Sequence, residues 1–306
     1  MVRPPVADIR SAIRLALQED CPLGDVTTAA LFPSPAPALA RIVAQESLVV
    51  AGLAAAVRTF RTVDASLVIT IHSQDGERAQ DGDCLLQIEG DGRSILKAER
   101  VALNFLQHLS GIATLTRRFC DAVREYPVTI LDTRKTIPGL RVLQKWAVLL
   151  GGGMNHRQSL SDGILIKDNH LALLSRTTTP IQTACRRAKA NALNTVNVIV
   201  EVESLADVRQ ALAGQADIIL LDNMTPALVR QAVTLIKGRA LVEVSGGITL
   251  KNVRAMAAAG PDRISIGALT HSAPGATLSL MLEPRRRPSG PSKLRKNYLS
   301  TVVRER

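Results

Sequence analysis

Side chains capable of binding or catalysis follow each of six short apolar segments in the second half of the chain. In chain order they are Asp132-Thr133-Arg134-Lys135, Lys167-Asp168-Asn169-His170, Glu201 with Glu203, Asp222-Asn223, Ser245-Gly246-Gly247 and Gly267. If the segments are parallel strands, their carboxyl ends meet at one edge, where α/β barrels carry their active sites. A cap or an ion pair would explain any one group, but polar groups at all six strand ends favour a functional site.

Cationic residues form the first chemical class in this region. They are Arg134, Lys135, His156, Arg157 and Lys167. Such a cluster repels itself unless an anion neutralises it. Arginine grips a carboxylate with a two-pronged fork and lysine adds a point charge. The cluster therefore predicts a site for a small molecule with two or more carboxylates, although any single member could be a solvated surface residue.

Acids and glycines form the second class. Glu201 and Asp222 lie at adjacent predicted strand ends, and two carboxylates there suit either Mg²⁺ with phosphates completing its shell or the hydroxyls of a ribose. Ser245-Gly246-Gly247 and Gly267-Ala268 offer backbone N–H groups, which is typical of phosphate sites at late barrel strands. Together the two classes indicate group transfer between a polyanionic acid and a phosphorylated sugar, without naming the reaction.

Alternating strands and helices must position these residues. The predicted strands are Val128–Leu131, Ile164–Ile166, Val198–Val200, Asp217–Leu221, Leu241–Val244 and Arg263–Ile266. The predicted helices are Leu140–Leu150, Ile181–Ala192, Leu205–Leu212, Ala227–Ile236 and Leu250–Ala259. Six strand–helix units imply a parallel sheet, open or closed into a barrel. The absence of a G-x-G-x-x-G motif after any strand disfavours dinucleotide binding.

The first hundred residues follow a different pattern. Apolar residues at four-residue spacing predict a helix that ends near Glu19, and strands are expected over Ala40–Val50, Leu67–His72 and Cys84–Glu89. A long helix is expected over Ser94–Leu109, where Ser110-Gly111 either interrupts it or marks a close contact.

Composition bounds the class of protein. The chain has 306 residues, 46% of them hydrophobic, which is enough for one large domain or two modest ones. Only 2% are aromatic, which argues against modules that stack nucleic-acid bases. The net charge is +11, but residues 284–306 hold eight basic residues and one acid, a net +7, leaving +4 for the rest.

The cysteines and the apolar runs indicate a compartment. Cys21, Cys84, Cys120 and Cys185 are widely spaced, so a disulfide framework or zinc site is not expected and a reducing cytosol fits. Charged residues interrupt the N-terminus, and the longest uncharged run, 264–282, contains glycine, proline and histidine. We therefore expect a cytoplasmic protein without a membrane segment.

Longer motifs extend these local patterns from about residue 10 to 282. They include Gly24-Asp25-Val26-Thr27-Thr28, Glu99-Arg100, Leu109-Ser110-Gly111-Ile112-Ala113-Thr114, Leu131-Asp132-Thr133-Arg134-Lys135-Thr136, Gly151-Gly152-Gly153, Asn155-His156-Arg157, Leu165-Ile166-Lys167-Asp168-Asn169-His170, Glu243-Val244-Ser245-Gly246-Gly247 and Gly267-Ala268-Leu269-Thr270-His271-Ser272. In these motifs the chain resembles the quinolinate phosphoribosyltransferase family, also called nicotinate-nucleotide pyrophosphorylase (carboxylating).

The resemblance implies a fold and an assembly. The expected fold is an α/β sandwich domain over residues 1–115 and an incomplete, about six-stranded parallel α/β barrel over 116–271, of the type II phosphoribosyltransferase kind. Part of 272–283 would return to the first domain, and 284–306 would form a basic tail. The implied assembly is a homodimer with shared active sites or a hexamer of such dimers.

The resemblance also implies an activity: quinolinate and phosphoribosyl pyrophosphate would give nicotinate mononucleotide, pyrophosphate and CO₂ with Mg²⁺, in NAD biosynthesis. Thr133, Arg134, Lys135, His156, Arg157 and Lys167 would bind quinolinate; Glu201 and Asp222 would face the ribose and metal, directly or through water; and Ser245, Gly246, Gly247, Gly267 and Ala268 would bind phosphate. Lys135, Lys167, Glu201 and Asp222 would be the catalytic residues, and Arg100 would reach into the neighbouring subunit.

Two alternatives stay open. A related transferase of the kind associated with molybdate transport would share the fold, but the intact Asn155-His156-Arg157 and Lys167-Asp168-Asn169-His170 argue against it. The basic tail could instead bind DNA or RNA, which would be salt-dependent and lost on truncation at Pro284. Its composition favours a solvated tail, so nucleic acid is not an expected partner.

Overall fold

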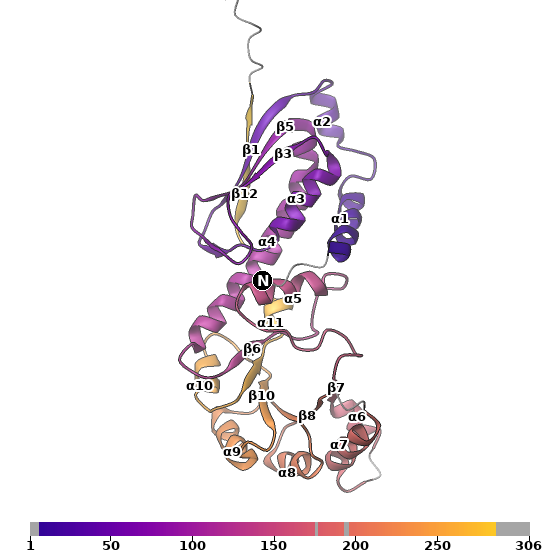
Figure 1. Cartoon of the computed structure of the whole chain (residues 1–306), viewed down its shortest axis with the longest axis vertical. Helices are drawn as coiled ribbons and strands as arrows, with labels where there is room; N and C mark the ends of the chain where they lie inside the picture. Colours follow the sequence, from indigo (N-terminus) through magenta and orange to yellow (C-terminus); the bar gives the residue numbers. More distant parts are fainter. Residues whose placement is uncertain (1–5, 175–176, 193–195, 286–306) are drawn as a thin grey trace, which may run out of the picture.

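The computed structural model describes residues 6–174, 177–192 and 196–285, which form two parts joined by one long helix (Figure 1). The first part contains helices α1 (Val6–Asp20), α2 (Val26–Leu31) and α3 (Leu53–Val63). Its strands are β1 (Pro37–Ala44), β2 (Leu48–Val49), β3 (Val68–Ile71), β4 (Arg78–Ala79), β5 (Cys84–Asp91) and β12 (Leu278–Pro284). The joining helix is α4 (Gly92–Val123).

An antiparallel sheet of order β12-β1-β5-β3 organises the first part. Alternate residues of β1, among them Ala40 and Ile42, are fully buried and pack in one core with residues of α3 and α4 such as Phe60 and Leu106. The opposite positions of β1 are only partly buried, as the period of two in a strand requires. This face of the sheet is thus the one covered by helices.

The strand expected over Ala40–Val50 is wrong as a single element. β1 ends at Ala44, and the polar residues Gln45, Glu46 and Ser47 turn the chain before β2, which pairs with β4 in a separate two-stranded sheet. The Glu46 carboxylate accepts a hydrogen bond of 2.6 Å from the backbone N–H of Thr277, so this turn is fixed to the segment that leads into β12.

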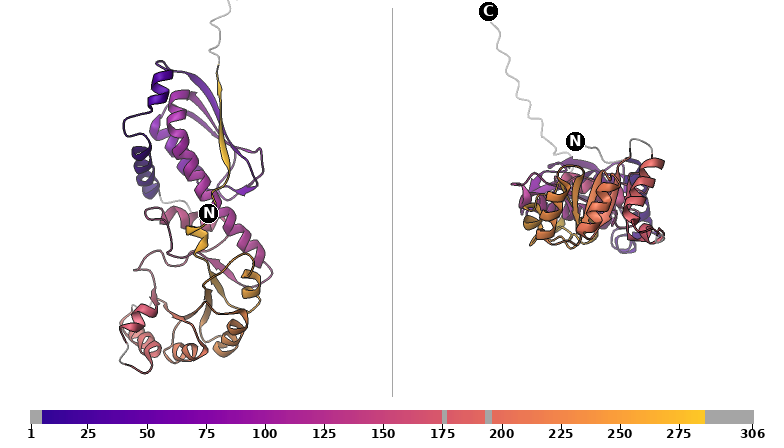
Figure 2. Two further views of the ribbon diagram at one scale, coloured as in Figure 1. Left: turned by 180° about the vertical axis from the view of Figure 1, so that it is seen from behind. Right: turned by 90° about the horizontal axis from the view of Figure 1, so that it is seen from below.

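Helix α4 passes from the sheet to the second part (Figure 2, left). It continues through Ser110 and Gly111, so the expected end at Leu109 is wrong. A Cβ on Gly111 would clash with the carbonyl oxygen of Pro274, so this glycine marks a close contact rather than a break. The expected domain boundary at residue 115 lies inside α4, which contributes to both cores: Leu103 and Leu106 pack in the core of the first part, and Phe105 and Phe119 pack in the other.

The second part is an open barrel of six parallel strands in the order β6-β11-β10-β9-β8-β7. The strands are β6 (Thr129–Leu131), β7 (Ile164–Ile166), β8 (Val198–Val202), β9 (Ile218–Asp222), β10 (Leu241–Ser245) and β11 (Arg263–Ser265). The helices are α5 (Arg141–Leu150), α6 (Asp168–Ala172), α7 (Pro180–Asn191), α8 (Leu205–Ala213), α9 (Pro226–Ile236), α10 (Val253–Ala257) and α11 (Ala268–His271). The predicted fold class is confirmed.

After α11 the chain returns to the first part. β12 pairs antiparallel with β1 along its whole length, from Leu278 opposite Ala44 to Pro284 opposite Ala38. The residue at which the tail was expected to begin is therefore the last of a strand, and residues 286–306 of that tail lie outside the described residues. No helix in the described part is both long and apolar enough to cross a membrane.

Candidate active site

Side-chain alternation points the polar residues of the barrel strands toward its interior. In β9, Ile219 and Leu221 belong to the core under the outer helices, whereas Ile218 and Leu220 pack with Ile199 in a separate interior cluster. Because side chains alternate along a strand, Asp222 shares the interior face with Ile218 and Leu220. The same alternation turns Glu201 on β8, and Glu243 and Ser245 on β10, toward the interior or its carboxyl edge.

The segment after β6 carries the first cations and is fixed at several points. The backbone N–H of Lys135 donates to Thr133 Oγ1 at 3.0 Å, and Thr270 Oγ1 donates to the Lys135 carbonyl at 2.7 Å. The N–H of Ile137 donates to Gln144 Oε1 at 3.0 Å, and Gln144 itself donates to the Thr270 carbonyl at 2.9 Å. Helices α5 and α11 thus hold the backbone around Arg134 and Lys135, while the Lys135 side chain is exposed.

Arg134 and Arg157 lie close enough to repel each other. Burial lowers the pKa of the Arg157 guanidinium, and the positive charge of Arg134 lowers it further. The Nε of Arg134 is buried and has no hydrogen-bond partner among the described residues. An arginine in that state has an unused donor at Nε, and a carboxylate would accept from it.

A buried network holds the loop that carries Asn155, His156 and Arg157. Asp132 and Lys145 form a salt bridge with 0% and 1% of their side chains exposed. Asp132 Oδ1 accepts from the His156 N–H at 2.9 Å, and Lys145 Nζ donates to the His156 carbonyl at 2.9 Å. With its amide nitrogen facing Asp132, Asn155 donates to Asp132 Oδ2 at 2.7 Å and to the Lys145 carbonyl at 2.9 Å.

Burial in this network shifts the pKa values of both charged groups. Burial raises the pKa of Asp132 to about 6 despite the nearby charge of Lys145, and burial lowers the pKa of Lys145. Both groups are thus shifted toward their neutral forms, which means that their mutual attraction does not fully offset desolvation. The pair therefore organises the loop and adds little net stability compared with apolar residues.

The acidic side of the site contains Glu201, Asp222 and their partners. Lys167 Nζ forms an ion pair with Glu201 Oε2, and Asn223 Nδ2 donates to Asp222 Oδ2 at 2.7 Å. Burial raises the pKa of Asp222, and the negative charge of Glu201 adds to this shift. Two carboxylates this close together form a natural donor pair for a divalent cation. In the described ranges no three His, Cys, Asp or Glu side chains cluster as a complete metal site.

Glycines open the carboxyl end of β10 and the start of α11. Gly246 has φ +89°, and a Cβ there would clash with the Asn223 side chain, so only glycine fits. Gly247 has nothing within 4 Å of the position a Cβ would take. A Cβ on Gly267 would lie 3.1 Å from Lys135 Cδ, so Gly267 and Ala268 adjoin the cationic side of the site.

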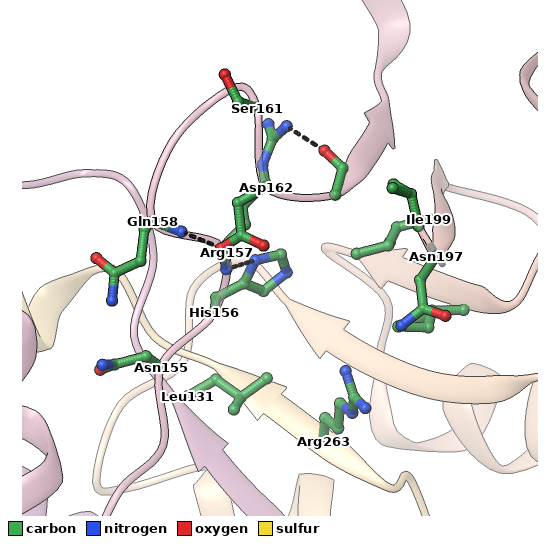
Figure 3. A pocket seen from close by; sticks show the side chains of 13 residues that line it. Leu131, Asn155, His156, Arg157, Gln158, Ser161, Asp162, Asn197, Ile199 and Arg263 are labelled. Carbon is green, nitrogen blue, oxygen red and sulfur yellow. Dashed lines mark hydrogen bonds between the residues drawn. The ribbon is translucent and has the colours of Figure 1, made fainter. Parts of the chain in front are cut away.

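A cavity of about 520 Å³ occupies the interior of the open barrel (Figure 3). His156 and Arg157 line it together with Asn197, Arg263 and other residues near the amino ends of the strands. The other predicted site residues of the barrel follow the carboxyl ends of its strands and do not line this cavity. His156 and Arg157 therefore stand between the interior and the carboxyl edge.

Arg100 is not brought to the other predicted residues. It is exposed on α4 between Ala98 and Ala102, which pack in the core of the first part. A single chain thus leaves Arg100 apart from the barrel edge.

Sequence reasoning did not assign roles to Asp132, Lys145, Asn155 or Glu243. Asp132 and Asn155 belong to two of the family motifs, but a motif does not show how deeply its residues are buried. Glu243 had a visible signal, since it stands between two valines of a predicted buried strand, where an unpaired acid is rare.

Two family models cover most of the chain. The model described as quinolinate phosphoribosyl transferase, N-terminal domain, matches residues 25–110. The model described as quinolinate phosphoribosyl transferase, C-terminal domain, matches residues 112–281. The two matches meet at Gly111, where α4 contacts the segment that returns to the sheet.

Known proteins are similar over the same length. Quinolinate phosphoribosyltransferase (decarboxylating) 1b of Nicotiana tabacum is 40% identical over 302 residues, covering 92% of this chain and 85% of the relative. The probable nicotinate-nucleotide pyrophosphorylase (carboxylating) of Bacillus subtilis is 40% identical over 262 residues, covering 86% and 89%. The solved nicotinate-nucleotide pyrophosphorylase of Francisella tularensis has a TM-score of 0.86 at 37% identity, covering 92% of this chain and 98% of that one.

Proposed function

The chain belongs to the quinolinate phosphoribosyltransferase family, and we propose that it transfers the phosphoribosyl group of phosphoribosyl pyrophosphate to quinolinate with loss of CO₂. The products are nicotinate mononucleotide and pyrophosphate, a step of NAD biosynthesis. One observation carries the proposal beyond family membership: Arg134 has a buried Nε without a partner in the described structure and lies beside Arg157. A dicarboxylate provides an acceptor for Arg134 Nε and places negative charge beside two guanidinium groups that repel each other.

The quinolinate side of the site is formed by the cations. Arg134 and Arg157 bind carboxylate oxygens, Lys135 and Lys167 add positive charge, and Thr133 lies beside them. This assignment is supported by the close approach of Arg134 to Arg157 and by the bonds that fix the backbone of both segments. His156 belongs to the same segment and lines the barrel interior together with Arg157.

The phosphoribosyl side is formed by Glu201, Asp222 and the glycines. Glu201 and Asp222 fit Mg²⁺, directly or through water, because their carboxylates are adjacent and the site leaves most of the shell to phosphate oxygens. When bound, Mg²⁺ supplies charge stabilisation for the departing pyrophosphate. Ser245, Gly246, Gly247, Gly267 and Ala268 lie where exposed backbone N–H groups could bind the 5′-phosphate.

The reaction follows from this placement. The pyridine nitrogen forms a bond to the anomeric carbon of the sugar while the bond from that carbon to the pyrophosphate oxygen breaks. Positive charge develops at the anomeric carbon, and the carboxylates of Glu201 and Asp222 stabilise it electrostatically. The ring nitrogen is then cationic, so the bond to the adjacent carboxylate can break with release of CO₂, and the ring carbon takes up a proton. Lys135 and Lys167 hold the acid in place through both steps.

A shared assembly completes the proposal. We propose a homodimer, or a larger assembly of dimers, in which Arg100 enters the pocket of the neighbouring subunit, because one chain leaves Arg100 exposed and apart from the barrel edge.

The four cysteines are unpaired. That state suits a reducing cytoplasm.

The test measures both products. Purified protein with Mg²⁺, phosphoribosyl pyrophosphate and carboxyl-labelled quinolinate should release CO₂ and form nicotinate mononucleotide in equal amounts, with none when either substrate is left out. Arg134→Ala should abolish the product, whereas Arg230→Ala, an exposed arginine on α9, should match the unaltered protein. Folded protein that makes neither product at saturating substrates overturns the proposal.

A further inference from the structure

Glu243 is a buried acid that the proposed chemistry leaves without a role. Its side chain is 0% exposed on the interior face of β10, and neither carboxylate oxygen has a hydrogen-bond partner in the part of the chain that the structure describes. A buried carboxylate in this state is costly, and native proteins keep such groups for a specific reason. The reason has to lie in what the carboxylate faces.

The group that faces Glu243 is the ring of His156. Nε2 of His156 lies 3.3 Å from Glu243 Oε1, and the histidine side chain is 9% exposed. On the other side of the ring, Nδ1 accepts the backbone N–H of Arg157 at 2.8 Å (Figure 3). A nitrogen that accepts a hydrogen bond carries no proton, so the proton of the neutral ring is on Nε2, the nitrogen that lies 3.3 Å from the carboxylate.

Both ring nitrogens of His156 therefore face groups of the protein: Nδ1 accepts a hydrogen bond from Arg157, and Nε2 lies 3.3 Å from Glu243 Oε1. The one N–H of the neutral ring, at Nε2, is thus beside the buried Glu243 carboxylate on a side chain that is 9% exposed, which sets His156 apart from Arg134, Arg157 and the lysines. Its backbone is held as well, because the N–H of His156 is bound by Asp132 and its carbonyl by Lys145. Ring and backbone together fix the position of the next residue, Arg157.

We propose that Glu243 is a positioning residue that fixes the His156 ring through Nε2–H, so that Nδ1 holds the backbone of Arg157 and orients its guanidinium toward the quinolinate carboxylate. The kinetic part of this inference rests on the proposed function, but the ring geometry does not. His156 transmits the position and makes no contact with substrate through its ring nitrogens.

The ring geometry is tested in the protein without substrate. NMR of ¹⁵N-histidine-labelled protein, with the His156 signal assigned by a His156→Gln variant, should show a protonated Nε2 and an unprotonated Nδ1. Glu243→Leu should shift both signals and the Arg157 amide signal. A proton on Nδ1 in the unaltered protein refutes the proposal whether or not any variant folds. Unchanged His156 and Arg157 signals in folded Glu243→Leu refute it equally.

The kinetic test separates positioning from folding. Glu243→Leu should raise the KM for quinolinate on the order of tenfold, as a misplaced binding group does, and leave the KM for phosphoribosyl pyrophosphate within about twofold. Glu243→Gln keeps an acceptor for Nε2–H and should recover most of the quinolinate affinity. Equal changes in both KM values would assign Glu243 a general structural role and overturn the proposal.

A matched control exists on α8. Gln210 also has a buried side-chain oxygen, Oε1, without a hydrogen-bond partner in the described residues, but it lies on an outer helix. Gln210→Leu removes an unpartnered buried oxygen as Glu243→Leu does, and both KM values should stay unchanged. If no variant or unaltered protein turns over quinolinate, the proposed function fails while the NMR result still decides the role of Glu243.

Discussion

Replacing Lys145 by methionine tests how the buried ion pair supports the site. Asp132 and Lys145 are 0% and 1% exposed, so Lys145→Met leaves a buried carboxylate without its counter-charge. Breaking one partner of such a pair costs on the order of 3–5 kcal/mol in the free energy of unfolding. The variant also loses the hydrogen bond from Lys145 Nζ to the His156 carbonyl.

The pH dependence of this loss identifies its cause. Burial raises the pKa of Asp132 from 3.8 to about 6 even with Lys145 present, so the folded state binds more protons than the unfolded state between these values. The contribution of Asp132 to the free energy of unfolding therefore falls as the pH rises from about 4 to about 6. Without Lys145 the pKa rises further. The cost of Lys145→Met should thus be larger at about pH 8 than at about pH 5, where the carboxyl is neutral.

A double variant separates charge from geometry. Asp132→Asn with Lys145→Met removes both charges but keeps an acceptor for the His156 N–H, so the total cost should fall to roughly 1–2 kcal/mol, about one or two hydrogen bonds. Urea unfolding at the two pH values gives the free energies, and the quinolinate KM reports the position of the loop. A single variant that costs under about 1 kcal/mol, or a double variant less stable than the single, would refute the reasoning.

Four further changes test the site. Lys135→Ala should raise the KM for quinolinate about tenfold and the KM for phosphoribosyl pyrophosphate much less, in steady-state kinetics; equal effects would remove its carboxylate role. Mixing Arg100→Ala and Lys135→Ala chains should restore roughly a quarter of the wild-type activity, because half of random dimers are hybrids with one intact site; no recovery with verified exchange would place Arg100 in its own subunit. Gly246→Ala should raise the KM for phosphoribosyl pyrophosphate and lower the free energy of unfolding by about 1–3 kcal/mol. The reason is that the left-handed backbone and the Asn223 side chain leave no room for a methyl group. Unchanged kinetics would exclude Gly246 from the phosphate site. Asp222→Asn should increase the Mg²⁺ concentration that gives half-maximal activity, and an unchanged value would contradict the metal role.

The strand ends could be predicted because the barrel strands are short apolar runs with abrupt polar ends. The expected Ile164–Ile166 is the observed β7, and the other expected barrel strands differ from the observed ones by one or two residues at an end. Parallel strands are buried on both faces, so their apolar runs stand out from the surrounding sequence. Because neighbouring strands of the sheet run parallel, the polar residues that follow the strands must lie at the same edge.

The burial of individual side chains and the contacts between residues distant in the sequence could not be predicted in the same way. The glycine at 111 allowed two interpretations, and only the position of Pro274 decides that α4 continues past it. The strand predicted over 40–50 is divided because Glu46 bonds to Thr277, which is remote in the sequence. The burial of Asp132 depends on elements packed from several sides, so local spacing does not reveal it, whereas the two valines beside Glu243 indicate its burial but not the histidine that it faces.

The arrangement separates what must stay fixed from what must exchange. Asp132, Lys145 and Glu243 are almost completely buried, and at this low exposure the ion pair between Asp132 and Lys145 is costly to break. Lys167 and Glu201 are 42% and 16% exposed, and an ion pair open to water is worth at most about 1 kcal/mol. In the proposed site, a quinolinate carboxylate would therefore replace Glu201 at Lys167, and a cation would replace Lys167 at Glu201, at little cost. Because each replacement releases the partner that the other substrate needs, this one pair links the two halves of the proposed site.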